Sequence, residues 1–150
     1  MTNEVLIRHA CQADFEDLLA LYRQLHPDDV TPADGSDRDA FIAIIESAHF
    51  HLFVATQGDS LVASTYLNVI PNVTRNASPY AVIENVITDA RYRYRGIGQQ
   101  IMAHTLEFAW RAGCYKAMLQ TGSKRESTHA FYRACGFNND EKVGYLARPP

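Results

Sequence analysis

The sequence has no long uninterrupted apolar run, although 47% of its 150 residues are hydrophobic. A membrane-spanning helix needs about 18 or more consecutive apolar residues, and no window approaches that length. The first residues also lack the basic and apolar regions of a secretory signal. We therefore expect a cytoplasmic protein with no membrane partner.

Cysteine is scarce, and the three cysteines lie far apart without a C-x-x-C pair: Cys11, Cys114 and Cys135. This spacing indicates neither a disulfide framework nor a thiolate zinc site, and it favours a reducing compartment. His49 and His51 would project to one side of a strand, as metal ligands do, but no third ligand is evident. We predict no metal site.

A strong excess of one charge is also absent, because 14 Lys and Arg stand against 17 Asp and Glu. A formal net charge of −3 argues against a surface committed to nucleic acid. The charges are nevertheless unevenly distributed, with three arginines between 91 and 95 and an aspartate-rich stretch from Asp28 to Asp39. That stretch could attract a cationic amine or could simply be solvated, and the sequence leaves both open.

No repeat, low-complexity tract or linker divides the chain, so we predict one domain over residues 1–150. Hydrophobic patterning predicts strands at 5–7, 51–56, 61–70, 80–88, 117–121 and 143–147, the second and third joined by a four-residue turn. Helical spacing predicts a helix capped by Asp14, one with a capping box at Ser36, and helices over 98–112 and 127–134. In the 98–112 helix we expect His104 to be solvated. Hairpins combined with one βαβ crossover predict an α/β fold with a sheet of mixed direction.

The run Arg91-Tyr-Arg-Tyr-Arg-Gly-Ile-Gly98 leads from the strand over 80–88 into the long helix. The first N–H groups of a helix have no partner within it, glycines let the backbone close around an oxyanion, and arginines add charge. The context predicts a phosphate site in preference to a merely solvated turn. The sequence has no G-x-x-x-x-G-K-S/T loop, and Ile101 occupies the place of the third glycine of a dinucleotide fingerprint.

The segment Arg93-Tyr94-Arg95-Gly96-Ile97-Gly98 matches the acetyl-coenzyme A signature Gln/Arg-x-x-Gly-x-Gly/Ala of the GCN5-related N-acetyltransferases, the GNAT family. A second stretch, from Cys114 to Phe137, resembles the fifth strand and the tyrosine-containing helix of that family. The Gly-Cys-Tyr-Lys run that begins at Gly113, and the pair Glu84-Asn85, are similar to small-molecule members such as glucosamine-6-phosphate and aminoalkylphosphonate acetyltransferases. The resemblance implies a single-domain GNAT fold, a mixed, mostly antiparallel twisted sheet flanked by about four helices.

The resemblance also implies an activity, the transfer of an acetyl group from acetyl-coenzyme A to a primary amine of a small molecule by direct attack on the thioester. Backbone N–H groups after the fourth strand would hold the pyrophosphate, and the end of that strand would pair with the pantetheine arm. The residues so implied in coenzyme binding are Val86, Ile87, Thr88, Arg93, Tyr94, Arg95, Gly96, Ile97, Gly98 and Gln99.

Three residues are candidates for the chemistry. Glu84 shares a strand face with Val82 and Val86, because alternate residues of a strand point to the same side, and a carboxylate in apolar surroundings would have the raised pKa of a general base. It could equally be a structural carboxylate. By resemblance, Tyr132 is the general acid and the Val86 N–H is the oxyanion donor; without the resemblance, Tyr132 is interpreted as core filling.

Other interpretations stay open. A protein or peptide N-acetyltransferase and a non-catalytic coenzyme A-binding regulatory module would both fit the sequence. The resemblance also suggests a homodimer, with residues 66–74 as an interface. Of the remaining candidates, His129 is expected to be structural and Cys135 to serve packing.

Overall fold

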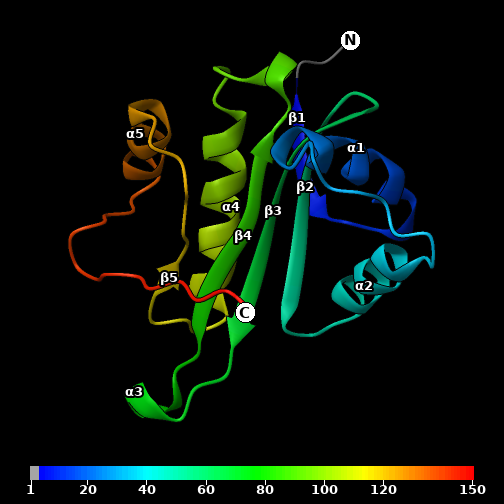
Figure 1. Cartoon of the computed structure of the whole chain (residues 1–150). Coiled ribbons are helices and arrows are strands. Elements are labelled where there is room, and N and C mark those ends of the chain that lie inside the picture. Colours follow the sequence, from blue (N-terminus) through cyan, green and yellow to red (C-terminus); the bar gives the residue numbers. More distant parts are fainter. Residues whose placement is uncertain (1–3) are drawn as a thin grey trace. The chain divides into compact units, whose positions relative to one another are not determined.

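Figure 1 shows the computed structural model, which describes residues 4–150. The chain divides into two compact units at the Leu119–Gln120 junction, and each is described by itself. The first unit is built on one sheet in the order β1-β2-β3-β4-β5, where the strands are β1 (Val5–His9), β2 (Phe50–Gln57), β3 (Ser60–Ile70), β4 (Tyr80–Thr88) and β5 (Ala117–Met118). All neighbours pair antiparallel except β4 and β5, which are parallel. The predicted mixed, mostly antiparallel sheet is therefore confirmed.

Helices cover both faces of this sheet. The first unit contains α1 (Phe15–Leu25), α2 (Ser36–Ile45), α3 (Thr74–Ala77), α4 (Ile97–Arg111) and the short 3₁₀ helices η1 (Gln12–Asp14) and η2 (Ala90–Tyr92). Adjacent residues of a strand point to opposite faces. Tyr66 of β3 packs against the cluster that α1 and α2 form with β2, whereas the hydroxyl of Thr65 bonds to that of Thr105 in α4 at 2.7 Å. Hence α1 and α2 lie on one face and α4 on the other (Figure 1).

The helix caps differ from the prediction. The Asp14 carboxylate makes no cap bond to α1; it accepts two bonds from the Arg8 guanidinium, at 2.7 and 2.9 Å, and one from the Cys11 N–H at 2.7 Å. A charge-assisted bidentate partner outcompetes the helix N–H groups. At α2 the cap position belongs to Gly35, with φ 75°, and Ser36 is the first helical residue, so the predicted capping box is wrong.

Three strand predictions also need correction. Gln57 pairs with Ser60, so the turn between β2 and β3 is the two-residue Gly58-Asp59, with Gly58 at φ 59°, and not a four-residue turn. β5 has only two residues. The predicted strand at 143–147 does not form, and its apolar side chains are exposed; an alternating pattern makes a strand only where a partner strand completes its hydrogen bonds.

The long helix α4 buries an apolar stripe that includes Ile101, Met102 and Ala109. His104 is half-buried and packs edge-on against the Phe53 ring, at 4.8 Å between centroids, so its predicted solvation is wrong. The second unit contains α5 (Glu126–Ala134), followed by Gly136 at φ 96°. In the part of the chain that the structure describes, no helix has the length and apolarity needed to cross a membrane.

Candidate active site

A β-bulge interrupts β4 at its centre. Tyr66 of β3 pairs with Glu84, and Ser64 pairs with Ile87. Two residues of β4, Asn85 and Val86, therefore lie opposite the single β3 residue Thr65. Asn85 has φ 51°, a left-handed conformation that asparagine adopts more readily than most residues. Asparagine is rare in strands, so its position within a β-branched run was the available sequence signal for this bulge.

The bulge changes which side chains share a face. Ser64 and Tyr66 are two residues apart in β3, so their side chains lie on the same face of the sheet. Residues paired across two strands also share a face, so their partners Ile87 and Glu84 lie on that face too. Val86 adjoins Ile87 and therefore faces the other side. The predicted common face of Glu84 and Val86 is wrong, because the prediction assumed regular alternation through the strand.

Glu84 lies on the face that α1 and α2 cover, opposite Tyr66, and its side chain is exposed. The apolar burial that we expected for this carboxylate is therefore wrong. Instead, the carboxylate can be reached by a solute on that face of the sheet.

The outer edge of β4 is only partly paired. β5 pairs with Ala81 and Val82, and in the described part of the first unit no strand continues this pairing past the bulge. The backbone groups of β4 beyond Val82 on this edge can thus pair with an extended ligand, as an added strand would.

A short loop joins β4 to α4, and Asp89 anchors its base. Asp89 is buried, with 4% of its surface exposed, and accepts bonds from the Arg91 N–H at 2.8 Å and the guanidinium at 3.1 and 3.0 Å. The Arg91 hydrogen bonds lower the pKa of the Asp89 carboxyl to about 2. Beyond it, the Arg93 Nε donates to the Thr88 carbonyl at 3.1 Å. The loop is therefore fixed at its base and carries exposed arginines.

The end of this loop presents backbone donors. Tyr94 and Gly96 have φ 61° and 78°, and α4 begins directly after them. Gln100 N–H donates to the Gly96 carbonyl at 3.0 Å, so the N–H groups of the three residues before Gln100 have no intrahelical acceptor. The arrangement of left-handed residues ahead of a helix N-terminus suits an anionic oxygen.

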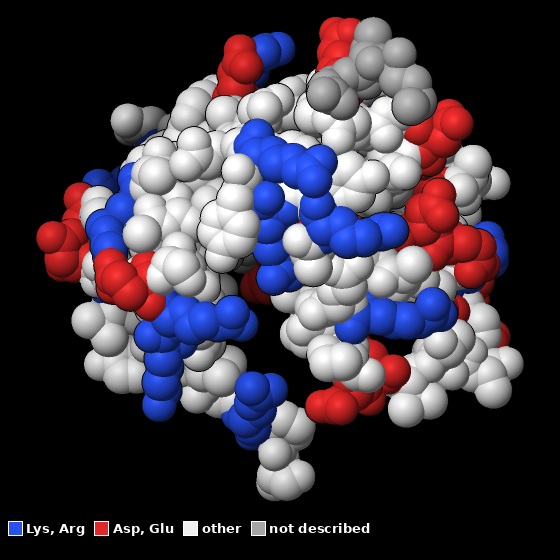
Figure 2. Space-filling view, turned by 90° about the horizontal axis from the view of Figure 1, so that it is seen from above, with Lys and Arg blue, Asp and Glu red and all other residues white. Residues whose placement is uncertain are grey.

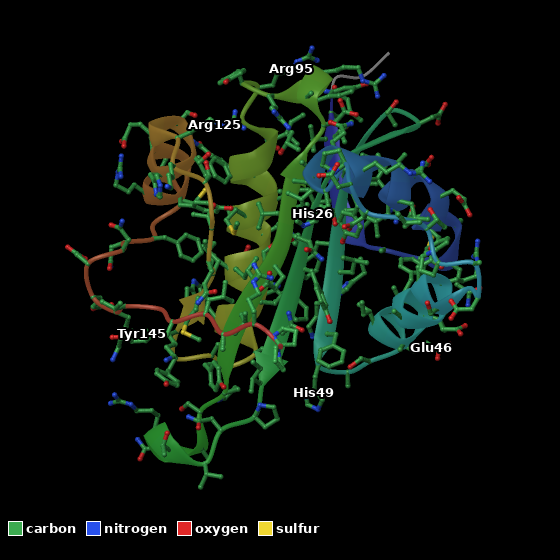
Figure 3. All side chains as sticks on the ribbon, viewed as in Figure 1. His26, Glu46, His49, Arg95, Arg125 and Tyr145 are labelled. Atoms are coloured by element: carbon green, nitrogen blue, oxygen red, sulfur yellow. The ribbon has the colours of Figure 1, made fainter. Side chains whose placement is uncertain are left out.

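Basic side chains surround these donors. Arg91, Arg93 and Arg95 are exposed, and the Arg95 guanidinium lies 5.1 Å from the centre of the Tyr92 ring. Figure 3 shows Arg95 at the end of the first unit where the loop enters α4, and Figure 2, which looks onto that end, shows exposed Lys and Arg side chains there. Free N–H groups and several cations match the oxygens and charge of a pyrophosphate.

Tyr132 belongs to α5 in the second unit. Its ring lies edge-on to those of Phe131 and Phe137, at 5.2 and 6.1 Å between centroids, and burial raises the pKa of its hydroxyl from its ordinary value. The hydroxyl is thus protonated at neutral pH, as a general acid must be. In the same unit the His129 Nε2 lies 2.9 Å from the Ser123 carbonyl, a local structural contact.

The remaining candidates make local contacts. His51 Nδ1 lies 3.1 Å from His9 Nε2, and burial lowers the pKa of both rings, whereas His49 is exposed. Between residues 4 and 150 no group of three His, Cys, Asp or Glu side chains is placed to hold a metal ion. In the acidic stretch, Asp34 accepts the Ser36 N–H at 3.0 Å, which ties one aspartate to the start of α2.

A cavity of about 450 Å³ opens elsewhere in the first unit. Its lining includes His49, Pro71, Phe108 and Ala112. Phe108 and Ala112 lie at the last turn of α4, whereas the arginine loop precedes the first turn. This cavity is therefore separate from the arginine loop and the N-terminus of α4.

Comparisons with known proteins identify the family of the chain. The model of the Acetyltransferase (GNAT) family matches residues 15–137. A solved structure from Agrobacterium tumefaciens str. C58, assigned as an acetyltransferase, is 39% identical, has a TM-score of 0.89 and covers 96% of this chain and 99% of that one.

Two curated proteins are similar in sequence. Glucosamine 6-phosphate N-acetyltransferase of Trypanosoma brucei brucei is 32% identical over 55% of this chain and 54% of its own, so the match spans about half of that relative. Aminoglycoside N(6')-acetyltransferase type 1 of Salmonella enteritidis is 24% identical over 91% of this chain and 94% of its own length. The family match covers most of the chain, and with the loop and strand geometry it shows that this protein belongs to the acetyltransferase (GNAT) family, as an N-acetyltransferase that uses acetyl-coenzyme A.

Proposed function

We propose that the acceptor is the primary amine of a small molecule, and more narrowly of an amino sugar. The names of the two curated relatives support this class, because glucosamine 6-phosphate and the aminoglycosides both carry amino groups on sugar rings. The exposed Glu84 on the face covered by α1 and α2 supports it as well, since a carboxylate there can attract an ammonium group.

The observation that carries the proposal is the bulged strand leading into the arginine loop. In this proposal the N–H groups of Ile97, Gly98 and Gln99, with Tyr94 and Gly96 shaping the turn, bind the pyrophosphate. Arg93 and Arg95 supply charge. The unpaired edge of β4 at Val86, Ile87 and Thr88 binds the pantetheine arm by strand-like hydrogen bonds, which directs the thioester to the bulge.

The proposed chemistry is direct transfer. Glu84, acting on the amine alone or through a water molecule, accepts its proton; the amine nitrogen then bonds to the thioester carbon. The Val86 N–H stabilises the oxyanion, the carbon–sulfur bond breaks, and Tyr132 gives its proton to the departing thiolate. The protonated state of Tyr132 supports the last role, because burial raises the pKa of its hydroxyl.

A thiol-release assay tests the acceptor class. We expect glucosamine 6-phosphate or an aminoglycoside to release coenzyme A from acetyl-coenzyme A far faster than peptides with free N-terminal or lysine amines. Faster release with the peptides would favour a protein acetyltransferase. Tight coenzyme binding without release on any amine would indicate the regulatory module instead.

Substitutions test the site. Arg93→Ala with Arg95→Ala should weaken acetyl-coenzyme A binding in a calorimetric titration by about tenfold or more, because charged hydrogen bonds contribute about 1.5–3 kcal/mol each. Arg23→Ala, an exposed arginine on α1, is the matched control. Equal affinity of the double variant and the control would refute the coenzyme site.

Glu84→Gln and Tyr132→Phe should each lower kcat by about 10²-fold or more, the usual contribution of a general base or acid, without a comparable loss of coenzyme affinity. The exposed residues Glu46 and Tyr145 offer controls as Glu46→Gln and Tyr145→Phe (Figure 3). Full turnover in both site variants would remove their catalytic roles.

We further propose that residues 1–150 act as one acetyltransferase domain, in the cytoplasm and as a homodimer. The three cysteines are all free, which supports a reducing compartment. Val73, within the proposed 66–74 interface, is 94% exposed and could be covered by a second copy. Light scattering should give the dimer mass, and Val73→Asp should shift it toward the monomer; a monomer in the unsubstituted protein would refute the dimer.

A further inference from the structure

Helix α1 touches the bulge of β4 through Tyr22. The side chain is mostly buried against the cluster formed by α1, α2 and β2, and its hydroxyl lies within reach of the side chains of Ser64 in β3 and Asn85 at the bulge. Ser64 in turn donates to the Phe53 carbonyl at 2.8 Å, which ties the group to β2. Burial raises the pKa of Tyr22 to about 12, so the hydroxyl stays neutral and keeps its proton for hydrogen bonding.

The same helix touches the base of the arginine loop through Gln24. Its Nε2 donates to the Asp89 carboxylate at 3.1 Å, and its Oε1 accepts the Ala90 N–H at 3.0 Å. Both partners lie about 65 residues away in the sequence and directly precede the arginines. The amide therefore uses its donor and its acceptor on one short backbone segment.

We infer that Tyr22 and Gln24 are positioning residues of the coenzyme site, each for a different part of the ligand. This inference rests on the proposed location of acetyl-coenzyme A. Tyr22 holds Asn85 in its left-handed conformation and so sets the direction of the β4 edge that takes the pantetheine arm. Gln24 holds the base of the loop that takes the pyrophosphate.

The physical basis is the cost of the conformation being held. A left-handed non-glycine residue is strained by about 1 kcal/mol or more, and a bulge can revert to regular pairing, which would turn each following side chain and N–H to the opposite direction. A buried hydrogen bond from a rigid helix opposes that reversal. The loop is mostly exposed, so its geometry depends similarly on Asp89 and on the Gln24 amide.

Two ligands separate the two roles. Calorimetric titrations with acetyl-coenzyme A and with 3′-phosphoadenosine 5′-diphosphate, which lacks the pantetheine arm, need no acceptor. Gln24→Ala should raise the Kd of both ligands by about threefold to tenfold, the range expected for one or two net hydrogen bonds. Tyr22→Phe should raise the Kd of acetyl-coenzyme A by a similar factor and leave that of the nucleotide within about twofold.

Controls make each outcome decisive. Arg23→Ala, between the two positions on α1, should alter neither Kd. Asn85→Gly removes the amide but tolerates the positive φ, so it should reproduce the selective loss of Tyr22→Phe, and the two effects should be less than additive in the double variant. Thermal melts of all variants establish that they are folded, and Asn85→Gly replaces Tyr22→Phe if the latter is not.

If Tyr22→Phe or Asn85→Gly raises the Kd of both ligands by the same factor, the role of Tyr22 is overturned, because a general loss of structure affects both ligands alike. Unchanged Kd values in Gln24→Ala would overturn the role of Gln24. The proposed coenzyme site fails separately, if the Arg93→Ala, Arg95→Ala variant binds both ligands as tightly as the unsubstituted protein.

Discussion

Replacing Asp89 by asparagine tests how the arginine loop is held. The carboxylate is 4% exposed and accepts three bonds from Arg91 and one from Gln24. Asparagine keeps the shape but offers one acceptor oxygen in place of two and no charge. Asp89→Asn should therefore loosen the loop base and lower stability together.

The size of the stability loss follows from the pKa. In the folded protein the pKa of Asp89 is lowered from 3.8 to about 2. At 1.36 kcal/mol per pKa unit, this shift contributes about 2 kcal/mol to the free energy of unfolding. The folded pKa lies below the unfolded one, so this contribution is fully present above about pH 5 and is lost as the pH falls toward about 2. The difference between the two proteins should shrink over that range.

Urea unfolding at a series of pH values measures the difference, and calorimetry measures acetyl-coenzyme A binding. The matched control is Asp14→Asn, because Asp14 is also buried, also bonds to an arginine and also has its pKa lowered to about 2, but precedes α1. Both variants should lose about 2 kcal/mol at pH 7. Only Asp89→Asn should weaken coenzyme binding, by about tenfold, as expected for lost charged hydrogen bonds.

Two results would refute this reasoning. If Asp89→Asn matches the unsubstituted protein in stability at pH 7, the carboxylate does not hold the loop. If both aspartate variants weaken coenzyme binding by the same factor, the effect comes from general destabilisation of the protein and not from the loop.

Three further outcomes are expected. Gly96→Ala places a side chain at φ 78° and should cost about 1 kcal/mol in urea unfolding while raising the Kd for acetyl-coenzyme A; unchanged values of both would contradict the loop geometry. Thr65→Val removes one of the two hydrogen-bond partners of the buried Thr105 hydroxyl; the other is the Ile101 carbonyl. The variant should lower the free energy of unfolding by about 1–3 kcal/mol. The exposed control Thr74→Val should lower it by less than about 0.5 kcal/mol. Burial raises the pKa of Tyr132, so a fall of kcat at alkaline pH caused by this hydroxyl should disappear in Tyr132→Phe; a fall that is unchanged in Tyr132→Phe would assign it to another group.

The local features of this protein could be predicted from the sequence. The turn into α4 depends on glycines and on the free N–H groups of a helix N-terminus, all within a few neighbouring residues. The buried stripe of α4 and the hairpin of β2 and β3 also follow from short-range periodicity. The arginine loop is therefore recognisable from its own residues alone.

The face of Glu84 could not be predicted in the same way. Its direction depends on a bulge, and the bulge depends on how β4 registers against β3, which lies about 20 residues earlier in the chain. An alternating pattern assumes regular pairing, so it placed Glu84 and Val86 together and made Glu84 buried. The predicted cap of α1 failed similarly, because Arg8 was a stronger partner for Asp14 than the helix was.

The sequence by itself thus determined most of the elements and the arginine-rich loop, because each arises from interactions between near neighbours. Only the tertiary structure decided the exposure of Glu84, the bulge at Asn85 and the contacts of Tyr22 and Gln24 with β4 and its loop. The bulge depends on pairing with β3, and the contacts of α1 join residues about 60 positions apart. No local pattern specifies which distant group will satisfy a buried hydroxyl or amide.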